Sequence, residues 1–171
     1  MASNPPSTSD WRELSLSQLE QEYSPSSMIG GNYQPYIQSY VDESARAYQS
    51  LACLRNVRYA SAPRALLDFF PAASSQAGLL IFIHGGYWQE LSKNESSLLA
   101  PAWVAAGLAH AVLDYDLAPA STLEAIVAQC QEAVDWLMER RKSSESRPSC
   151  SRNSRCRTPA CSAARRPPWR Q

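Results

Sequence analysis

The sequence predicts an α/β fold with a mostly parallel sheet and flanking helices, and three observations support this prediction. Residues 79–83 (LLIFI) are apolar at every position, which is typical of a strand covered on both faces and central in a parallel sheet. A glycine loop and a helical pattern follow this strand. The same strand-then-helix order is repeated over 108–138, and it favours parallel strands joined by right-handed crossovers.

The composition is that of a globular chain of 171 residues, of which 44% are hydrophobic and 19% charged. These values exclude a wholly disordered chain, a collagen-like repeat and a coiled coil. The longest apolar stretch, 78–83, is far shorter than the roughly 20 residues of a membrane-spanning helix, so no membrane partner is expected. The first residues show no secretory signal, which makes the cytoplasm the expected location.

Two helices are predicted before the sheet. Residues 1–10 are rich in Ser, Pro and Asn and predict a mobile end. Ser15 and Gln18 match a capping box before a short helix that ends at Pro25, since proline disfavours helical geometry in the residue before it. Tyrosines and aliphatic residues at helical spacing then predict an amphipathic helix over 35–51, which packs against the sheet rather than stacking on bases.

Further strands and helices follow in turn along the chain. After the helical spacing of 35–51, the hydrophobic pattern changes its period, and residues 56–60 and 65–70 are predicted to be strands. Residues 98–106 form a predicted helix and 108–113 another strand. The longest predicted helix covers about 121–142, with a Ser or Thr cap at its start and three basic residues at its end, where the helix dipole favours cations.

The predicted domain covers 1–142, and the tail over 143–171 differs from it in composition. The tail has seven Arg and one Glu, whereas the preceding part has 9 basic and 15 acidic residues, so the net charge of zero describes neither part. The tail has no apolar period and predicts disorder. It could hold RNA or an acidic partner electrostatically. Its abrupt start is more typical of an alternative or out-of-frame ending, so nucleic acid is not the expected partner.

The five cysteines predict neither a disulfide framework nor a metal site. Their number is odd, no secretory signal precedes them, and no pair has C-x-x-C spacing.

One motif carries chemistry. His84, Gly85, Gly86, Tyr87 and Trp88 follow the apolar strand and precede a helix. Adjacent glycines let the backbone turn without Cβ clashes and can point successive N–H groups into one concavity. Such donors stabilise a developing oxyanion, each by roughly 3 kcal/mol. The alternative is a plain strand-to-helix turn with an aromatic pair packed over it.

The motif and its surroundings resemble the kynurenine formamidase (arylformamidase) family of α/β-hydrolases. The segments that carry the resemblance are 19–26, 82–89, 93–96 and 115–119, within about 14–140. The loop matches the His-Gly-Gly-x-Trp signature of that family.

The resemblance implies a function and roles for the loop. The family hydrolyses N-formyl-L-kynurenine, an aryl formamide, to L-kynurenine and formate in tryptophan catabolism, without a metal or organic cofactor. By resemblance, the N–H groups of Gly85 and Gly86, with Tyr87, form the oxyanion hole. Trp88 shapes the wall of the substrate pocket, and His84 braces the loop by hydrogen bonding.

The chain departs from the family pattern at the nucleophile. The family carries a serine in G-x-S-x-G on the turn after the next strand, with an Asp and a His further on. The six glycines of this chain enclose no serine at that spacing. The sequence therefore predicts a truncated α/β-hydrolase fold that matches the N-terminal half of the family. No catalytic residue is assigned, and negligible formamidase activity is expected of the 171 residues.

Three other polar residues invite a catalytic interpretation. His110 lies in an apolar stretch, which favours a structural role over that of a base. Asp114 and Asp116 stand two apart at a strand end and could form a carboxylate pair, but capping of the loop is the favoured interpretation.

Other functions stay open. The chain could belong to an esterase of simple esters, a non-catalytic binder, or a protein that interacts through its basic tail. The expected partner is a small aryl formamide or ester. An unpaired edge of the sheet could also associate with a second copy.

Overall fold

The computed structural model describes residues 10–145, which divide into two compact units, one up to Ser39 and one from Tyr40. In the first unit, a 3-10 helix η1 (Trp11–Glu13) precedes α1 (Leu16–Glu22) and a second 3-10 helix η2 (Pro25–Ile29). The predicted capping box is confirmed: Ser15 N donates to Gln18 Oε1 at 2.8 Å, while Gln18 N donates to Ser15 Oγ. Helix α2 (Gln34–Ser50) begins in this unit and continues into the second.

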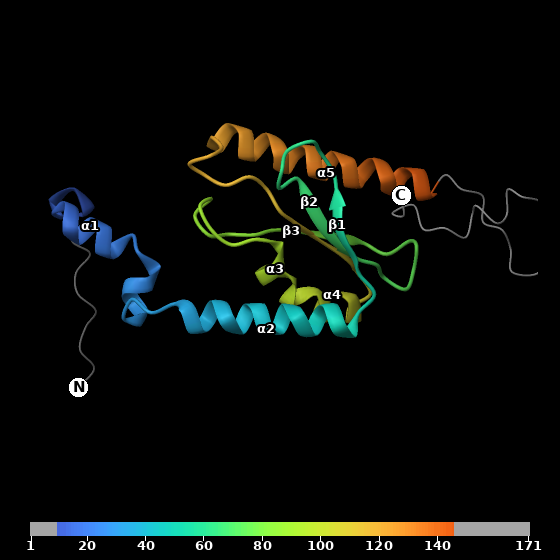
Figure 1. The fold of residues 1–171 in the computed structure, drawn as a ribbon, viewed down its shortest axis with the longest axis horizontal. Coiled ribbons are helices and arrows are strands. Elements are labelled where there is room, and N and C mark those ends of the chain that lie inside the picture. The colour runs from blue at the N-terminus through green and yellow to red at the C-terminus, as the bar shows by residue number, and fades with distance from the viewer. Residues whose placement is uncertain (1–9, 146–171) are drawn as a thin grey trace, which may run out of the picture. The chain divides into compact units, whose positions relative to one another are not determined.

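In the second unit, a four-stranded sheet lies between helices on both of its faces (Figure 1). The sheet order is β1-β2-β4-β3. The strands are β1 (Leu54–Arg58), β2 (Leu66–Phe70), β3 (Leu79–Ile83) and β4 (Ala109–Leu113). The helices after β3 are α3 (Lys93–Ser96), η3 (Ser97–Leu99) and α4 (Ala100–Ala105), and α5 (Leu123–Glu145) follows β4.

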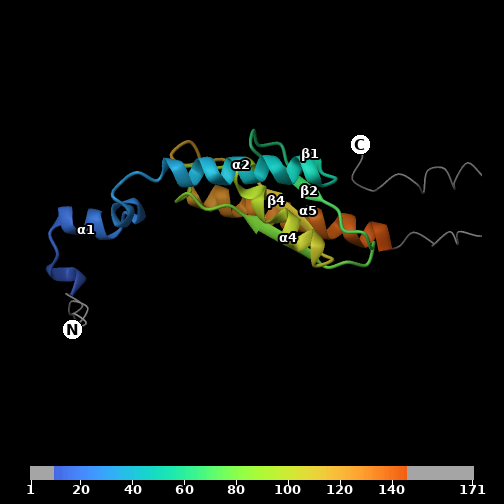
Figure 2. The ribbon, with the colours of Figure 1, turned by 90° about the horizontal axis from the view of Figure 1, so that it is seen from below.

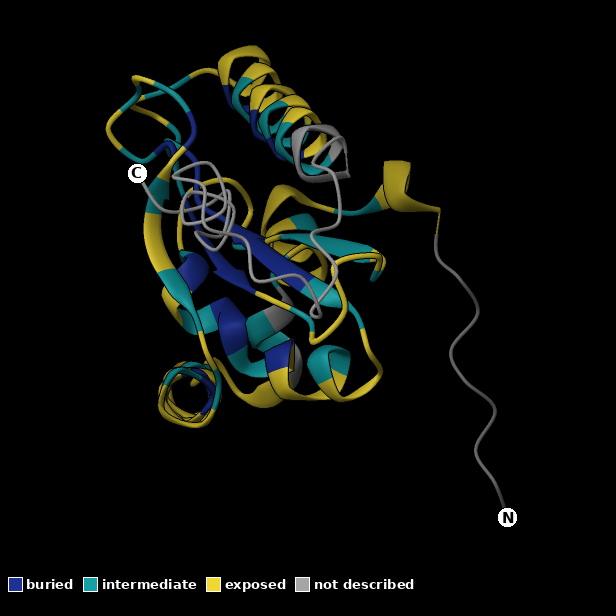
Figure 3. Ribbon diagram, turned by 90° about the vertical axis from the view of Figure 1, so that its right-hand side faces the viewer, coloured by how far each residue is buried: buried dark blue, intermediate teal, exposed yellow. Residues whose placement is uncertain are grey.

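The two faces of the sheet have separate cores, as the alternation of side chains along a strand requires. On one face, Leu67 and Ala111 pack with Leu137 of α5. On the other face, Val112 packs with Ala47 of α2 and Ala100 of α4. Viewed from the side of α2 and α4, α5 lies behind the sheet (Figure 2). The most deeply buried strands therefore lie between two helical layers (Figure 3).

The prediction of a mostly parallel sheet is wrong, because the sheet is mixed. Only β3 and β4 are parallel, whereas β1 pairs with β2, and β2 with β4, in antiparallel orientation. For β1 and β2 the reason lies in the connection over 59–65, which is too short for the crossover of a dozen or more residues that parallel neighbours need.

The prediction that 79–83 is a central strand is also wrong. In the sheet that the described residues form, β3 lies at an edge, its residues are only partly buried, and Ile83 is 47% exposed. The buried interior strands are β2 and β4. An apolar run shows that helices cover both faces of a strand, but it does not show how many neighbouring strands pair with it.

Other elements match their predictions within a few residues. Strand β1 begins two residues earlier than predicted, and the helix predicted over 98–106 is divided among η3 and α4. Helix α5 continues to Glu145, beyond the predicted domain boundary at Lys142. Apart from Asp10, which caps η1, and residues 143–145, which continue α5 and are therefore helical, the segments predicted to be mobile or disordered lie outside the described residues. None of the helices in the described part is both long and apolar enough to cross a membrane.

A buried ion pair fastens α3 to the sheet. The carboxylate of Asp68 on β2 is fully buried and accepts hydrogen bonds from Lys93 Nζ at 3.1 Å and from Tyr48 Oη at 2.7 Å. Asn56 N donates to its other oxygen at 2.7 Å, and Tyr48 Oη also contacts Ser97 Oγ at 2.7 Å. Because each partner comes from a different element, the cluster sets where α3 begins after the glycine loop.

Candidate functional site

The glycine loop after β3 turns through three consecutive residues with positive φ. These residues are Gly86 (96°), Tyr87 (55°) and Trp88 (61°). A positive φ is uncommon for residues with bulky side chains and marks a conformation that the surroundings must enforce. Gln89 N and Glu90 N both donate to Gly86 O, at 3.0 and 3.1 Å, and so close the turn.

The two glycines of the loop differ in how strictly glycine is required. At Gly86, a Cβ would overlap the carbonyl group of Glu90, and the positive φ adds strain for any L side chain. At Gly85, a Cβ would meet no atom within 4 Å, and its φ lies outside the left-handed region. A Gly-Gly pattern alone does not show this difference.

The loop also presents unpaired amides. Within residues 10–145, nothing accepts a hydrogen bond from the N–H groups of Gly85, Gly86 or Tyr87. These groups belong neither to the β3 ladder nor to a helix. Unpaired amides of this kind can donate to an incoming oxygen that carries negative charge.

His84 holds the start of the loop. Its ring is buried and stacks on Tyr115, with centroids 4.2 Å apart and planes 7° from parallel. Nδ1 lies 2.8 Å from Gly85 O, and because a carbonyl can only accept, this nitrogen is the donor. Nε2 lies 3.3 Å from Asp114 Oδ1, within ion-pair range but outside hydrogen-bond geometry. Tyr115 Oη adds a hydrogen bond to His84 O at 2.7 Å.

Asp114 connects His84 to distant parts of the chain. Arg64 Nη2 donates to Asp114 Oδ1 at 2.8 Å and to Leu91 O at 2.9 Å, so one guanidinium joins the end of β4 to the end of the loop. Tyr59 Oη donates to Asp114 O at 2.7 Å. Burial raises the pKa of Asp114, but the contacts with His84 and Arg64 outweigh burial and lower it below its usual value.

Asp116 organises the neighbouring loop. Its Oδ1 accepts from Arg64 N at 3.0 Å and its Oδ2 from Gln129 Nε2 at 3.2 Å, while its own N–H donates to Gln129 Oε1 at 3.0 Å. Arg64 thus bonds to both carboxylates, to Asp114 through its guanidinium and to Asp116 through its backbone N–H. These contacts fit the predicted loop-capping role of Asp114 and Asp116.

His110 lies outside this site, as predicted. It is fully buried on β4, on the face of the sheet that α2 and α4 cover. Its ring faces Phe70 and Phe82.

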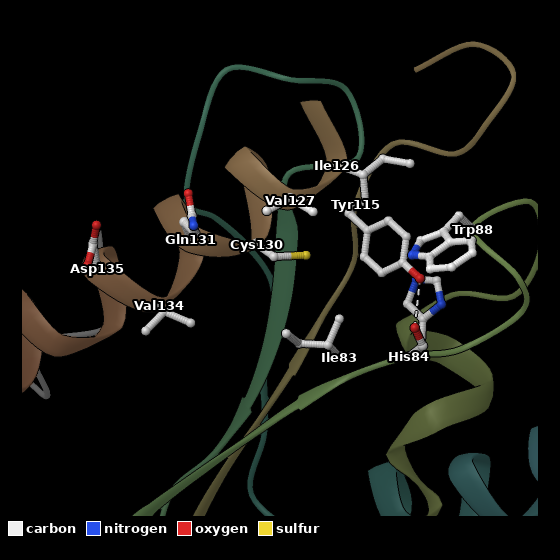
Figure 4. Close-up of a pocket in the computed structure, with 10 residues that line it drawn as sticks. All are labelled: Ile83, His84, Trp88, Tyr115, Ile126, Val127, Cys130, Gln131, Val134 and Asp135. Carbon is white, nitrogen blue, oxygen red and sulfur yellow. Dashed lines mark hydrogen bonds between the residues drawn. The ribbon is translucent and has the colours of Figure 1, made fainter. Parts of the chain in front are cut away.

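A hollow of about 620 Å³ opens between the loop, the end of β3 and α5 (Figure 4). Trp88 and Tyr115 stand at one end, together with His84. The rest of the lining is mainly apolar and comes from Ile83, Ile126, Val127, Cys130, Gln131, Val134 and Asp135. Gly85 lines a second hollow of about 330 Å³ on the other side of the loop, with Leu91. Tyr87 lines neither hollow and is 69% exposed.

The sequence analysis missed two residues of the site. Arg64 carries no local signal, since a single arginine near a turn is usually exposed. Tyr115 falls in a segment that carries the family resemblance, but no spacing rule connects it to His84. For metals, residues 10–145 contain no group of three His, Cys, Asp or Glu side chains that could hold an ion.

Solved structures with the same arrangement of elements define the class of protein. A protein described as a thioesterase from Silicibacter sp. TM1040 has a TM-score of 0.64 and 28% identity, over 68% of this chain and 45% of that one. Esterase LipW from Mycobacterium marinum has a TM-score of 0.53 and 16% identity, over 71% and 40%. The fold is therefore that of the α/β-hydrolases.

Sequence comparison identifies the family that the chain resembles. A kynurenine formamidase from Danio rerio is 33% identical over 133 residues, which are 74% of this chain and 45% of the relative. One from Salmo salar is 32% identical over the same shares, and one from Drosophila melanogaster is 37% identical over 78 residues, 44% of this chain and 26% of the relative. No protein-family model matches. The predicted resemblance to kynurenine formamidases is thus confirmed, and the chain spans under half the length of these relatives.

Proposed function

We propose that this chain supplies the oxyanion-binding part of a formamidase that hydrolyses N-formyl-L-kynurenine to L-kynurenine and formate. The observation that carries the proposal is the run of unpaired amides at Gly85, Gly86 and Tyr87, in a chain 33% identical to a kynurenine formamidase. We also take the functional domain to end near residue 142 and the protein to act in the cytoplasm on a small aryl formamide.

Hydrolysis of a formamide requires a nucleophile and hydrogen-bond donors for the carbonyl oxygen. A nucleophile attacks the formyl carbonyl, and the carbonyl oxygen gains a negative charge that needs hydrogen-bond donors. The loop amides would supply these donors, each worth roughly 3 kcal/mol in the transition state. The C–N bond then breaks, the aryl amine of kynurenine leaves with a proton, and water releases formate from the formylated nucleophile.

These 171 residues lack the family's form of the nucleophile, because none of their serines stands in a G-x-S-x-G pattern. We therefore expect the 171-residue chain to bind kynurenine-like ligands without turnover. The end of the large hollow beside Trp88 and Tyr115 would hold the aryl ring. A cavity of about 620 Å³ is within the usual range for a small-molecule site, roughly 300–1,000 Å³.

A hybrid enzyme tests the proposal. Residues 10–142 replace the matching part of the Danio rerio relative, and hydrolysis of N-formyl-L-kynurenine is measured for the hybrid and for the 171-residue chain. We expect turnover by the hybrid only. In the hybrid, Gly86→Ala should lower kcat about 100-fold or more, because it displaces the donors, while Gly85→Ala should have a much smaller effect.

Three outcomes would contradict the proposal. Family-like rates from the 171-residue chain alone would show that another nucleophile operates. Equal effects of Gly85→Ala and Gly86→Ala in the hybrid would show that the loop geometry is not what binds the oxyanion. A preference of the hybrid for short acyl esters over aryl formamides would favour the alternative of a carboxylesterase.

A further inference from the structure

The unpaired amides of Gly85, Gly86 and Tyr87 belong to three consecutive peptide groups. A peptide group joins the carbonyl of one residue to the N–H of the next, so the N–H of Gly85 shares its group with the carbonyl of His84. Within residues 10–145, the N–H of each of these three groups has no acceptor. The carbonyl of each group, in contrast, accepts a hydrogen bond.

The three carbonyls receive their hydrogen bonds from different donors. Tyr115 Oη donates to His84 O at 2.7 Å and lies a longer 3.5 Å from Gly85 O (Figure 4). His84 Nδ1 donates to Gly85 O at 2.8 Å. Gly86 O accepts from the two amides that close the turn. Every peptide group with a free N–H is therefore bonded at its carbonyl.

A hydrogen bond to a carbonyl polarises the whole peptide group. It draws electron density toward the oxygen and leaves the N–H of the same group more positive, and hydrogen bonds linked in this way strengthen one another by about 10–30% each. Tyr115 and His84 are both buried, so water does not compete for their donors. The two side chains therefore make the free N–H groups stronger donors than ordinary loop amides.

We propose that Tyr115 and His84 are positioning residues that polarise the oxyanion-binding amides. Tyr115 acts on the N–H of Gly85 through the carbonyl of His84, and His84 acts on the N–H of Gly86 through the carbonyl of Gly85. This assignment rests on the proposed function, because the stronger donors serve the negative oxygen of that reaction. Both side chains act through the backbone, and neither transfers a proton.

Polarisation by Tyr115 differs from simple bracing of the loop in its dependence on donor strength. A brace requires only that the hydrogen bond is present, whereas polarisation increases as the donor becomes stronger. A fluorinated tyrosine has nearly the same shape and a more acidic hydroxyl, so it is a stronger donor. Burial raises the pKa of Tyr115, which keeps the hydroxyl of a fluorinated ring protonated near neutral pH.

NMR of the full 171-residue chain tests the proposal without substrate. The chain has six glycines, so isotopic labelling of glycine alone gives a simple spectrum of amide groups. Tyr115→Phe keeps the ring and removes the hydroxyl, so the amide nitrogen of Gly85 should shift upfield, while fluorotyrosine at position 115 should shift it downfield. Tyr59→Phe is the matched control, because it removes an equally short bond of a buried hydroxyl, to Asp114 O at 2.7 Å, and should leave the Gly85 signal in place.

Two variants of His84 separate its donor from its ring. Asn places a side-chain N–H where Nδ1 lies, since both nitrogens are bonded to Cγ, whereas Ala has no donor. Both variants lose the stacking on Tyr115, so the difference between them reports the hydrogen bond to Gly85 O. The amide nitrogen of Gly86 should therefore lie further upfield in His84→Ala than in His84→Asn.

Kinetics of the hybrid enzyme give a second measurement. Loss of one oxyanion donor lowers kcat roughly 100- to 1,000-fold. A change of about 10–30% in the strength of such a donor corresponds to a factor of about two to eight. Tyr115→Phe should thus lower kcat about two- to eightfold with little change in KM, and fluorotyrosine should raise kcat. Tyr59→Phe should leave kcat unchanged.

The outcomes distinguish this proposal from the proposed function. A Gly85 signal that moves no further in Tyr115→Phe than in Tyr59→Phe, or that does not follow fluorination, would overturn the polarisation. So would equal Gly86 signals in the two variants of His84. If the signals follow donor strength while the hybrid fails to hydrolyse N-formyl-L-kynurenine, the polarisation is supported and the proposed function is contradicted.

Discussion

Acid is expected to destabilise the fold through His110. The ring is fully buried between Phe70 and Phe82, whose centroids are 6.2 and 6.4 Å away, and neither ring nitrogen has a hydrogen-bond partner within residues 10–145. Burial lowers the pKa of His110 from 6.5 to about 4 and outweighs a contact with the Leu80 backbone, which acts in the opposite direction. The native state therefore holds this ring neutral at a pH at which the unfolded chain already binds a proton.

The sign and size of the effect follow from linkage. Because the pKa is lower in the folded state, the stability that the neutral ring contributes is fully present above pH 6.5 and is lost as the pH falls toward 4. Over that window the free energy of unfolding falls by about 1.4 kcal/mol per pH unit, or ~3 kcal/mol in total by pH 4. This is a large part of the roughly 5–15 kcal/mol that stabilises a typical domain.

Urea unfolding at pH 7, 6 and 5 measures this dependence. Between pH 7 and pH 5 the wild-type chain should lose about 2 kcal/mol, whereas His110→Leu should lose much less over the same interval. The comparison uses slopes, so a change in the absolute stability of the variant does not affect it. His84 is retained in both proteins, and the pKa of Asp114, lowered from 3.8, places its contribution below this window. Equal slopes for the two proteins would refute the reasoning.

Three further substitutions test the packing of the site by urea unfolding. Gly86→Ala should lower the free energy of unfolding by about 1–3 kcal/mol, because of the positive φ and the overlap with the Glu90 carbonyl. Gly85→Ala should change it by no more than about 0.5 kcal/mol. Similar losses for the two variants would contradict the loop geometry. Arg64→Met leaves the Asp114 carboxylate without its guanidinium partner. It should lower the free energy of unfolding by about 1–3 kcal/mol, since the guanidinium is partly exposed. A loss no larger than that of the exposed Arg58→Met would contradict this expectation. Lys93→Met removes the buried cation beside the Asp68 carboxylate and leaves only the half-exposed Arg55, 3.8 Å away, so it should cost up to about 3–5 kcal/mol. A neutral result would mean that Arg55 and the remaining donors suffice.

The sequence was most informative where the signal is local. The capping box at Ser15 and Gln18 depends on groups three residues apart, and the structure confirms it. The loop at Gly85 and Gly86 follows from two adjacent glycines after an apolar strand. The helical spacing that predicted α5 depends on one face of one helix. In each case the residues that form the structure are close in sequence.

Sheet order and the bracing of the loop depend on contacts that no local pattern encodes. The run of 79–83 is apolar because α4 and α5 cover its two faces, and this holds equally for a central and an edge strand. The ion pair of Arg64 with Asp114 joins residues 50 apart. Asp114 could be predicted to cap a loop, but the position of His84 against it depends on the pairing of β3 with β4.

The proposed chemistry requires both oxyanion binding and a nucleophile, and the long-range contacts described above concern only the first of these. The loop holds positive φ at Tyr87 and Trp88, and the contacts that brace it come from Arg64, Asp114 and Tyr115, all within the described part of the chain. The donor geometry therefore does not depend on the segment that carries the nucleophile in the relatives. Binding of an oxyanion and turnover should then be separable, and a ligand that mimics the tetrahedral intermediate should bind the 171-residue chain and lose affinity in Gly86→Ala.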